Sequence, residues 1–230
     1  MGVSAQMWEQ LLAAGVGRRF RRGEVMLRQG DPPSHVLLLM SGRVKVVLAL
    51  PSGEILLAVR GPGELLGDIG VLGDQDEGRS ATVIAIDPCV TSVLPAARFR
   101  ALVRSAGLGD ELLRSAMRRL REGEKWRAET AVLPAGPRVA RALVRLAAPG
   151  PTPKTAPRLT ATPGPAAGEP VEVALGQAEI GQAVGLSRGV VAAELSRLRE
   201  QGVVVTSRGR IVITDLPRLR ALAESGHGSV

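Results

Sequence analysis

Cysteine and aromatic residues are scarce in this chain, and each scarcity argues against a class of site. The 230 residues include one cysteine, two tryptophans, two phenylalanines and no tyrosine. A single cysteine, Cys89, excludes a disulfide framework, a cysteine zinc site and a multi-cysteine iron–sulfur cluster. We expect Cys89 to be a small buried hydrophobic residue. Few aromatic rings also leave little on which unpaired bases could stack, which argues against a platform for single-stranded nucleic acid.

Histidine and long apolar runs are scarce too. His35 and His227, each expected on the solvated surface, cannot assemble a Ser/His/Asp or Cys/His catalytic set or supply the axial ligands of a haem. No apolar run approaches the roughly 18 residues of a spanning helix, and the N-terminus lacks the layout of a secretory signal. We therefore expect a cytoplasmic protein that is not an enzyme, with no metal site and no membrane association.

Positive charge is what the chain has in excess, with a net charge of +8. This balance makes nucleic acid the first partner to consider. Because aromatic residues are scarce, duplex DNA is a better hypothesis than a single strand. Charge alone also fits membrane-surface and merely arginine-rich proteins, so the assignment depends on motifs.

Residues 20 to 94 consist of short apolar runs closed by turn residues, after a short helix that ends near Gly15. The runs are residues 24–30, 35–42, 43–50, 54–61, 80–86 and 90–95. Glycines fall between them, as in Gly61-Pro62-Gly63, where turns require them. This spacing predicts an antiparallel β-barrel or jelly roll, which we assign to residues 1–107.

From Pro95 onward the apolar period becomes helical. The apolar stripe stops around Gly123 and resumes near Ala131, which predicts a long helix interrupted at Gly123. We assign residues 108–133 to a dimerisation helix and hinge, because a second copy of the helix is the simplest cover for its stripe. The candidate dimerisation residues are Leu113, Met117 and Leu120. The charged residues Arg118, Arg119, Arg121, Glu122 and Glu124 are predicted to form a solvated face.

Residues 134–230 are predicted to form a winged helix-turn-helix domain with an insertion at 148–170, where seven prolines in 23 positions exclude a helix or a central strand. Beyond it a short helix, a turn at Gly185-Leu186 and a second helix capped by Ser187 have helix-turn-helix spacing. A hairpin follows with Arg208 and Arg210 near its tip, which is typical of a wing. The predicted fold class is α+β.

A barrel, a long helix and a winged helix-turn-helix in this order resemble the Crp/Fnr family of bacterial transcription regulators over roughly residues 15 to 220. Three stretches carry the resemblance: "GELLGDIG" with "RSATV", "GPRVARALVRLA", and "EIGQAVGLSRGVV". The resemblance implies a homodimer paired along the long helix, a barrel of the cyclic-nucleotide-binding type, transcription control at a palindromic site in double-stranded DNA, and RNA polymerase as a partner.

The resemblance also implies a ligand site. In the family's phosphate-binding cassette a glycine and an acidic residue meet the ribose, and an arginine and a serine bind the cyclic phosphate. The candidate ligand-binding residues are Gly67, Asp68, Arg79, Ser80 and Ala81. The guanidinium fork of arginine suits phosphate oxygens. The alternative is that Arg79 only pairs with its acidic neighbours on the surface.

Three departures from the family keep the ligand open. The acidic position holds Asp68 rather than the usual glutamate, acidic residues at positions 74, 76 and 77 precede Arg79, and Gly123-Glu124 stand where cyclic AMP receptors carry a threonine–serine pair. Carboxylates near Arg79 oppose an incoming phosphate. Cyclic AMP, another cyclic nucleotide, another anionic metabolite and no ligand all remain candidates.

The second helix of the helix-turn-helix departs from the family as well. Ser187 and Arg188 match the pair that contacts a phosphate and a guanine, but Gly189 and Ala193 occupy contact positions where well-studied members carry glutamate and arginine. We expect Arg188 to be the main direct reader of bases. Together with the residues already named, Arg197, Arg208 and Arg210 are DNA-binding candidates, which we expect on phosphates.

The prediction as a whole is a DNA-binding transcription regulator in which occupancy of the barrel near Arg79 shifts the long helix around Gly123 to Leu133. One alternative is an effector-independent DNA-binding protein with a vestigial pocket. Another is a nucleotide-binding module that acts on a protein partner. The sequence identifies neither the ligand, nor the operator, nor the direction of regulation.

Overall fold

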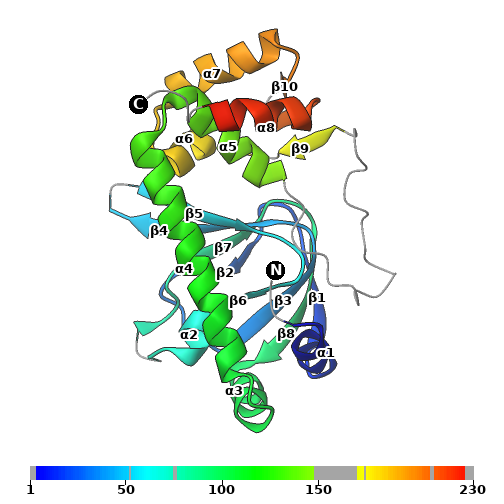
Figure 1. The fold of residues 1–230 in the computed structure, drawn as a ribbon. Coiled ribbons are helices and arrows are strands. Elements are labelled where there is room, and N and C mark those ends of the chain that lie inside the picture. Colours follow the sequence, from blue (N-terminus) through cyan, green and yellow to red (C-terminus); the bar gives the residue numbers. More distant parts are fainter. Residues whose placement is uncertain are drawn as a thin grey trace. The chain divides into compact units, whose positions relative to one another are not determined.

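The computed structural model describes residues 4–51, 53–74, 77–147, 170–173, 175–207 and 210–225 (Figure 1). The chain divides into two compact units, one of which includes the residues up to Glu122 and the other those from Gly123 to Ala147 with the C-terminal elements. Each unit is described by itself. The predicted proline-rich insertion lies outside the described residues apart from Pro170.

The first unit contains two four-stranded antiparallel sheets, as the predicted jelly roll requires. In spatial order, one sheet consists of β1 (Val16–Phe20), β8 (Cys89–Pro95), β3 (His35–Ser41) and β6 (Glu64–Leu66). The other consists of β2 (Val25–Leu27), β7 (Thr82–Ala85), β4 (Val44–Leu50) and β5 (Gly53–Arg60). The expected antiparallel fold is thus confirmed.

Strand β3 supplies both cores of this unit. Leu37 and Leu39 belong to the cluster that the two sheets share, whereas Leu38 belongs to the cluster on the other face. This alternation follows from the two-residue period of a strand, and an apolar run is expected where both faces are buried. The outer cluster includes Trp8 of α1 (Ala5–Ala13) and Phe99 of α3 (Ala96–Ser105).

Two elements of the first unit were not predicted from the sequence. Strand β1 begins at Val16, and only Phe20 of its five residues is buried, so the strand lacks an apolar alternation. The five-residue helix α2 (Asp68–Leu72) follows β6 directly. It is too short to show a helical period.

Helix α4 (Gly109–Val132) runs without a break through Gly123. The predicted interruption at this glycine is therefore wrong. Glycine inside a helix destabilises it by roughly 1 kcal/mol relative to alanine, which a helix of 24 residues tolerates. Even so, the division between the two units falls at Gly123.

In the described part of the second unit, the end of α4 and four further helices pack with a small antiparallel sheet. The four further helices are α5 (Ala135–Ala147), α6 (Gln177–Val184), α7 (Arg188–Glu200) and α8 (Leu216–Glu224). The sheet has the order β10 (Val204–Ser207), β11 (Arg210–Ile213), β9 (Val171–Val173). Helix α5 lies against α8 (Figure 1), and Leu143, Ile180, Leu195 and Leu219 form part of the buried interior. No helix in the described part of the chain combines the length and the apolar composition that crossing a membrane requires.

Candidate ligand pocket and nucleic-acid interface

Gly67 lies where the chain turns from β6 into α2. Its φ of 79° is in the left-handed region, which glycine adopts without strain. A Cβ at this position would lie 2.5 Å from Nη1 of Arg79. A side chain at position 67 would therefore displace the arginine, and the structure brings these two predicted site residues together.

Arg79 is buried, with 5% of its surface exposed. Its Nη2 donates a hydrogen bond to the carbonyl oxygen of His35 at 2.7 Å, and its Nη1 is buried without a hydrogen-bond partner. Burial lowers the pKa of Arg79, and the charge of Asp31 partly offsets this. The alternative in which Arg79 pairs with acidic neighbours on the surface is wrong for the described residues, because the guanidinium points inward.

Asp68 has a partner that the sequence did not predict. The side chain of Asp68 is 5% exposed. Its carboxylate accepts hydrogen bonds from Nη1 of Arg119 at 3.0 Å and from Nη2 at 2.5 Å. The side chain of Arg119 is 19% exposed, and its Nε is buried without a partner. The expectation that Arg119 belongs to a solvated face of α4 is therefore wrong. The signal available was helical spacing, since Arg119 follows the buried Leu112 by seven residues, two turns of helix.

The remaining cassette residues lie at the end of the loop. Ser80 is exposed and Ala81 is half-buried, immediately before β7. Of the acidic residues expected to oppose a phosphate, position 76 lies outside the described residues, and those at 74 and 77 are exposed.

His35 and Cys89 lie on strands. His35 is the first residue of β3 and is half-buried, rather than lying on the solvated surface as expected. Burial lowers its pKa, as do the charges of Arg79 and Arg18. Cys89 is buried as expected, and burial, with the charge of Asp87, raises the pKa of its thiol to about 12. His227 lies outside the described residues. No group of three or more histidine, cysteine, aspartate or glutamate side chains suited to a metal ion occurs among those described.

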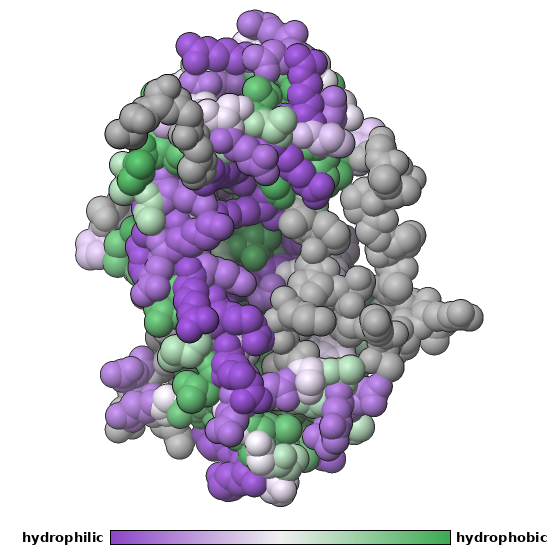
Figure 2. All heavy atoms as spheres, in the orientation of Figure 1, coloured by the Kyte–Doolittle hydropathy of each residue, from purple (hydrophilic) through white to green (hydrophobic). Residues whose placement is uncertain are grey.

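One face of α4 is apolar and exposed. Leu112 is buried at 4% exposure, whereas Leu113, Met117 and Leu120 are 58%, 44% and 50% exposed. Their spacing of four and three residues places these three on one face. Figure 2 shows apolar patches among the hydrophilic residues that cover much of the visible surface. Leu120 is exposed on this face, whereas the preceding residue, Arg119, is directed toward Asp68, so the two neighbours lie on different sides of α4.

The helix-turn-helix forms where the sequence predicts it. Helix α6 ends at Val184 and is capped by Gly185, whose φ of 64° is left-handed. Ser187 caps α7 by accepting a hydrogen bond from the amide of Val190 at 3.3 Å. A Cβ at Gly181 would lie 2.5 Å from the carbonyl oxygen of Leu186. The close approach at Gly181 was not predicted. Arg188 and Gly189 are both exposed at the start of α7.

Two of the arginines predicted to contact phosphates form ion pairs with nearby glutamates. Arg197 is 70% exposed and pairs with Glu194 at 3.1 Å. Arg210 pairs with Glu172 of β9 at 3.5 Å. Arg208, which was predicted to lie near the tip of the wing, is outside the described residues. Arg199, which sequence reasoning missed, donates to Oγ1 of Thr206 at 3.1 Å and so joins α7 to the wing.

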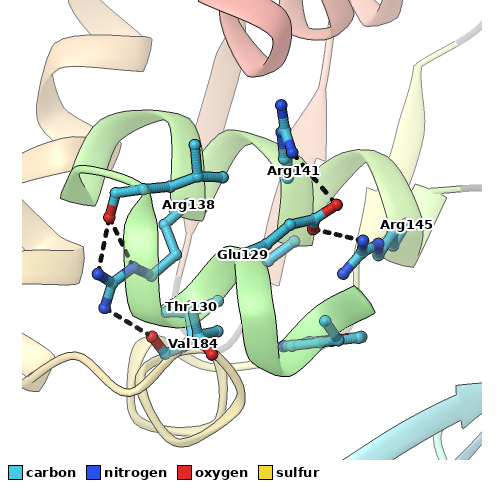
Figure 3. A pocket seen from close by; sticks show the side chains of 9 residues that line it. Glu129, Thr130, Arg138, Arg141, Arg145 and Val184 are labelled. Carbon is cyan, nitrogen blue, oxygen red and sulfur yellow. Dashed lines mark hydrogen bonds and ion pairs between the residues drawn. The ribbon is translucent and has the colours of Figure 1, made fainter. Parts of the chain in front are cut away.

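The last turns of α4 are fastened to α5 within the second unit (Figure 3). Glu129 pairs with Arg141 at 3.2 Å and with Arg145. The guanidinium of Arg145 lies 4.9 Å from the ring centroid of Trp126, whose Nε1 donates to the carbonyl oxygen of Ala183 at 2.8 Å. We call these contacts the Glu129 clasp. Its cations are already engaged, so we assign no ligand to the small cavity beside it.

Comparisons with known proteins match both units. Residues 17–106 match the cyclic nucleotide-binding domain, and residues 137–222 match the Crp-like helix-turn-helix domain. The cyclic AMP receptor protein of Thermus thermophilus is 30% identical over 209 residues, which cover 90% of this chain and 87% of that protein. The CRP-like cAMP-activated global transcriptional regulator of Mycobacterium tuberculosis is 29% identical over 87% of this chain and 84% of its own.

Two further comparisons concern the sensor region and the fold. Acetyltransferase Pat of Mycolicibacterium smegmatis is 37% identical over 98 residues, but these amount to 43% of this chain and 29% of that enzyme. The chain thus spans less than a third of that relative. The crystal structure of a CRP-family transcriptional regulator from Thermus thermophilus has a TM-score of 0.67 and 25% identity, with 93% of this chain and all of that one covered. The chain belongs to the Crp/Fnr family of DNA-binding transcription regulators.

Proposed function

We propose that the sensor unit binds a cyclic nucleotide with its phosphate at Arg79, and that occupancy of this site controls DNA binding by a homodimer. The observation that carries the proposal is the buried guanidinium of Arg79, whose Nη1 has no partner and faces Gly67. A buried cation is costly unless an anion or acceptors satisfy it. A cyclic phosphate supplies both a negative charge and acceptor oxygens.

Asp68 completes the site on the ribose side. A carboxylate has about four lone-pair positions, so Asp68 can accept a ribose hydroxyl while it pairs with Arg119. Ser80 is exposed and free to offer its hydroxyl to the phosphate. The names of two relatives, both described as activated by or receptors of cyclic AMP, support a cyclic nucleotide as the ligand class.

Exposed side chains support the proposed dimer and DNA contacts. The stripe of Leu113, Met117 and Leu120 is a suitable interface for a second copy of α4. Arg188 and Arg197 are exposed on α7 and suit a guanine edge and a phosphate, respectively. As a regulator of transcription, the protein would act in the cytoplasm, where the DNA lies, with RNA polymerase as its partner.

A ligand-independent regulator is the second candidate, and the ion pair between Asp68 and Arg119 favours it. This pair satisfies the acidic residue of the cassette without any ligand. Arg79 argues the other way, since its Nη1 is left unsatisfied.

Calorimetric titration with cyclic AMP, cyclic GMP and cyclic di-GMP decides between the two. The variant Arg79→Met lacks the charge-assisted hydrogen bonds of the guanidinium. It should bind the nucleotide that the wild type binds about ten- to a hundredfold more weakly. Arg18→Met, which removes an exposed arginine of β1, should bind like the wild type. Equal binding by Arg79→Met and the wild type would refute the assignment of Arg79. Tight DNA binding without nucleotide binding would support the ligand-independent regulator.

A further inference from the structure

The first turn of α7 contains a glycine that the fold itself does not require. Gly189 has a φ outside the left-handed region, and a Cβ there would meet nothing nearer than Oγ of Ser187 at 4.0 Å. Glycine in a helix is less stable than alanine. Neither strain nor crowding among the described residues requires a glycine here, and the missing side chain leaves the first turn of α7 open to close approach by a partner.

Val190 is the second unusual residue of this turn. The residue is 39% exposed, although the neighbouring Val191 is completely buried and supplies the core contact. A β-branched residue lowers helix propensity. A single exposed valine is ordinary, but Val190 lies next to Gly189 and near the exposed Ala193. Together these three residues make a small apolar surface on the solvent side of α7.

The bases themselves limit what such a surface can contact. In the major groove adenine, guanine and cytosine present hydrogen-bond donors and acceptors, whereas thymine adds a C5 methyl group, which small apolar side chains contact. Exposed arginines, Arg188 and Arg197, lie on the same helix, so its charge is complementary to DNA. A thymine methyl is therefore the partner whose chemistry fits the apolar part of this helix.

We propose that Val190 determines sequence specificity by packing against the C5 methyl of a thymine, and that Gly189 and Ala193 allow the helix to approach the base edges closely. This inference rests on DNA binding through α7. It predicts a half-site in which a thymine lies close to the guanine that Arg188 reads. The loss of glutamate and arginine at positions 189 and 193 then replaces polar base readout by apolar readout.

The test begins with selection of binding sites from random duplex DNA by the full-length protein. Selection is run without nucleotide and with cyclic AMP, cyclic GMP or cyclic di-GMP. Each thymine of the selected half-site is then replaced by deoxyuridine, which removes the C5 methyl and leaves the base-pairing groups unchanged. Burial of one methyl-sized group is worth about 0.8 kcal/mol, which corresponds to an affinity change of about fourfold.

Two variants assign the effect to Val190. Val190→Ala favours the helix, so its folding should be preserved, and it should bind thymine- and deoxyuridine-containing sites with nearly equal affinity. Val16→Ala changes an exposed valine of the sensor unit. It should prefer the thymine-containing site over the deoxyuridine-containing site about fourfold, as expected of the wild type.

The outcomes are distinct. A fourfold preference for thymine at one position, lost in Val190→Ala alone, supports the inference. Selected sites without a fixed thymine, no effect of deoxyuridine at any position, or the same effect in Val190→Ala would overturn it while leaving DNA binding intact. Failure to select any DNA under all four conditions would overturn both this inference and the DNA-binding role on which it rests.

Discussion

Arg119 holds both carboxylate oxygens of Asp68 across a separation of 51 residues in the sequence, at 3.0 Å and 2.5 Å. The pair ties α4 to the start of α2, next to Gly67 of the candidate ligand site. The next residue of α4, Leu120, belongs to the exposed apolar stripe. One helix therefore carries a residue of the ligand site and the proposed dimer interface on different faces.

Arg119→Met should destabilise the first unit by about 3 to 5 kcal/mol, because it leaves the carboxylate of Asp68 buried without its counter-charge. Chemical denaturation of the full chain measures the change. The double variant Asp68→Asn with Arg119→Met should recover a large part of the loss, since no buried charge remains. Equal destabilisation of the single and double variants would contradict the pair's electrostatic role.

Arg79→Met should have the opposite effect on the ligand-free protein. The substitution removes a buried cation and keeps an apolar chain of similar length, so the free energy of unfolding should rise by roughly 1 to 3 kcal/mol. Thermal unfolding without ligand checks this, with Arg18→Met as the exposed control. A lower melting temperature for Arg79→Met would show that its bond to the carbonyl of His35 outweighs the burial of charge.

Leu113→Glu combined with Leu120→Glu should yield monomers. Both side chains are at least half exposed, so the fold of one chain should survive, whereas burial of two carboxylates between helices is unfavourable. Light scattering gives the mass, and DNA affinity should fall because one half-site remains. The variant Arg114→Glu, on another part of the exposed surface of α4, is the matched control. A dimer that persists in the double variant would place the interface elsewhere.

Cys89 makes stability depend on pH in the alkaline range. Its pKa is about 12 in the folded chain, against 9.0 for an ordinary cysteine. The folded state retains the thiol proton where the unfolded state has lost it, so this stabilisation is complete below about pH 9 and is lost progressively up to about pH 12. Denaturation midpoints of Cys89→Ala should fall less steeply than those of the wild type between these values. Identical slopes would contradict the raised pKa.

Patterns within one element were predictable from the sequence. The turn of the helix-turn-helix is an example, because Gly185 acts through its own backbone conformation and Ser187 through a hydrogen bond to the nearby amide of Val190. The antiparallel sheets were predictable for the same reason, since apolar runs and glycine turns alternate along the chain. The family match confirms the order of the elements.

Features that depend on distant partners were not predictable. Arg119 stands in a run of charged residues that resembles a solvated face, and only the approach of Asp68 from another element makes it part of the site. Gly123 was predicted to break α4, but the helix continues, because local propensity is weaker than the stability of a long helix. Strand β9 has three residues, too few for a pattern, and pairs with β11.

The Glu129 clasp makes the end of α4 part of the unit that contains the helix-turn-helix. Trp126 and Glu129 belong to the same compact unit as α7, and their bonds to Ala183, Arg141 and Arg145 fix the last turns of α4 to the helices around it. A rotation of the last turns of α4 would therefore move α5 and α6 with it, because side-chain contacts and not only the short connection to α5 join these helices. Weakening the Glu129 clasp would therefore loosen the attachment of the last turns of α4 to α5 and α6, while the sensor unit, which contains none of these contacts, would keep its own structure.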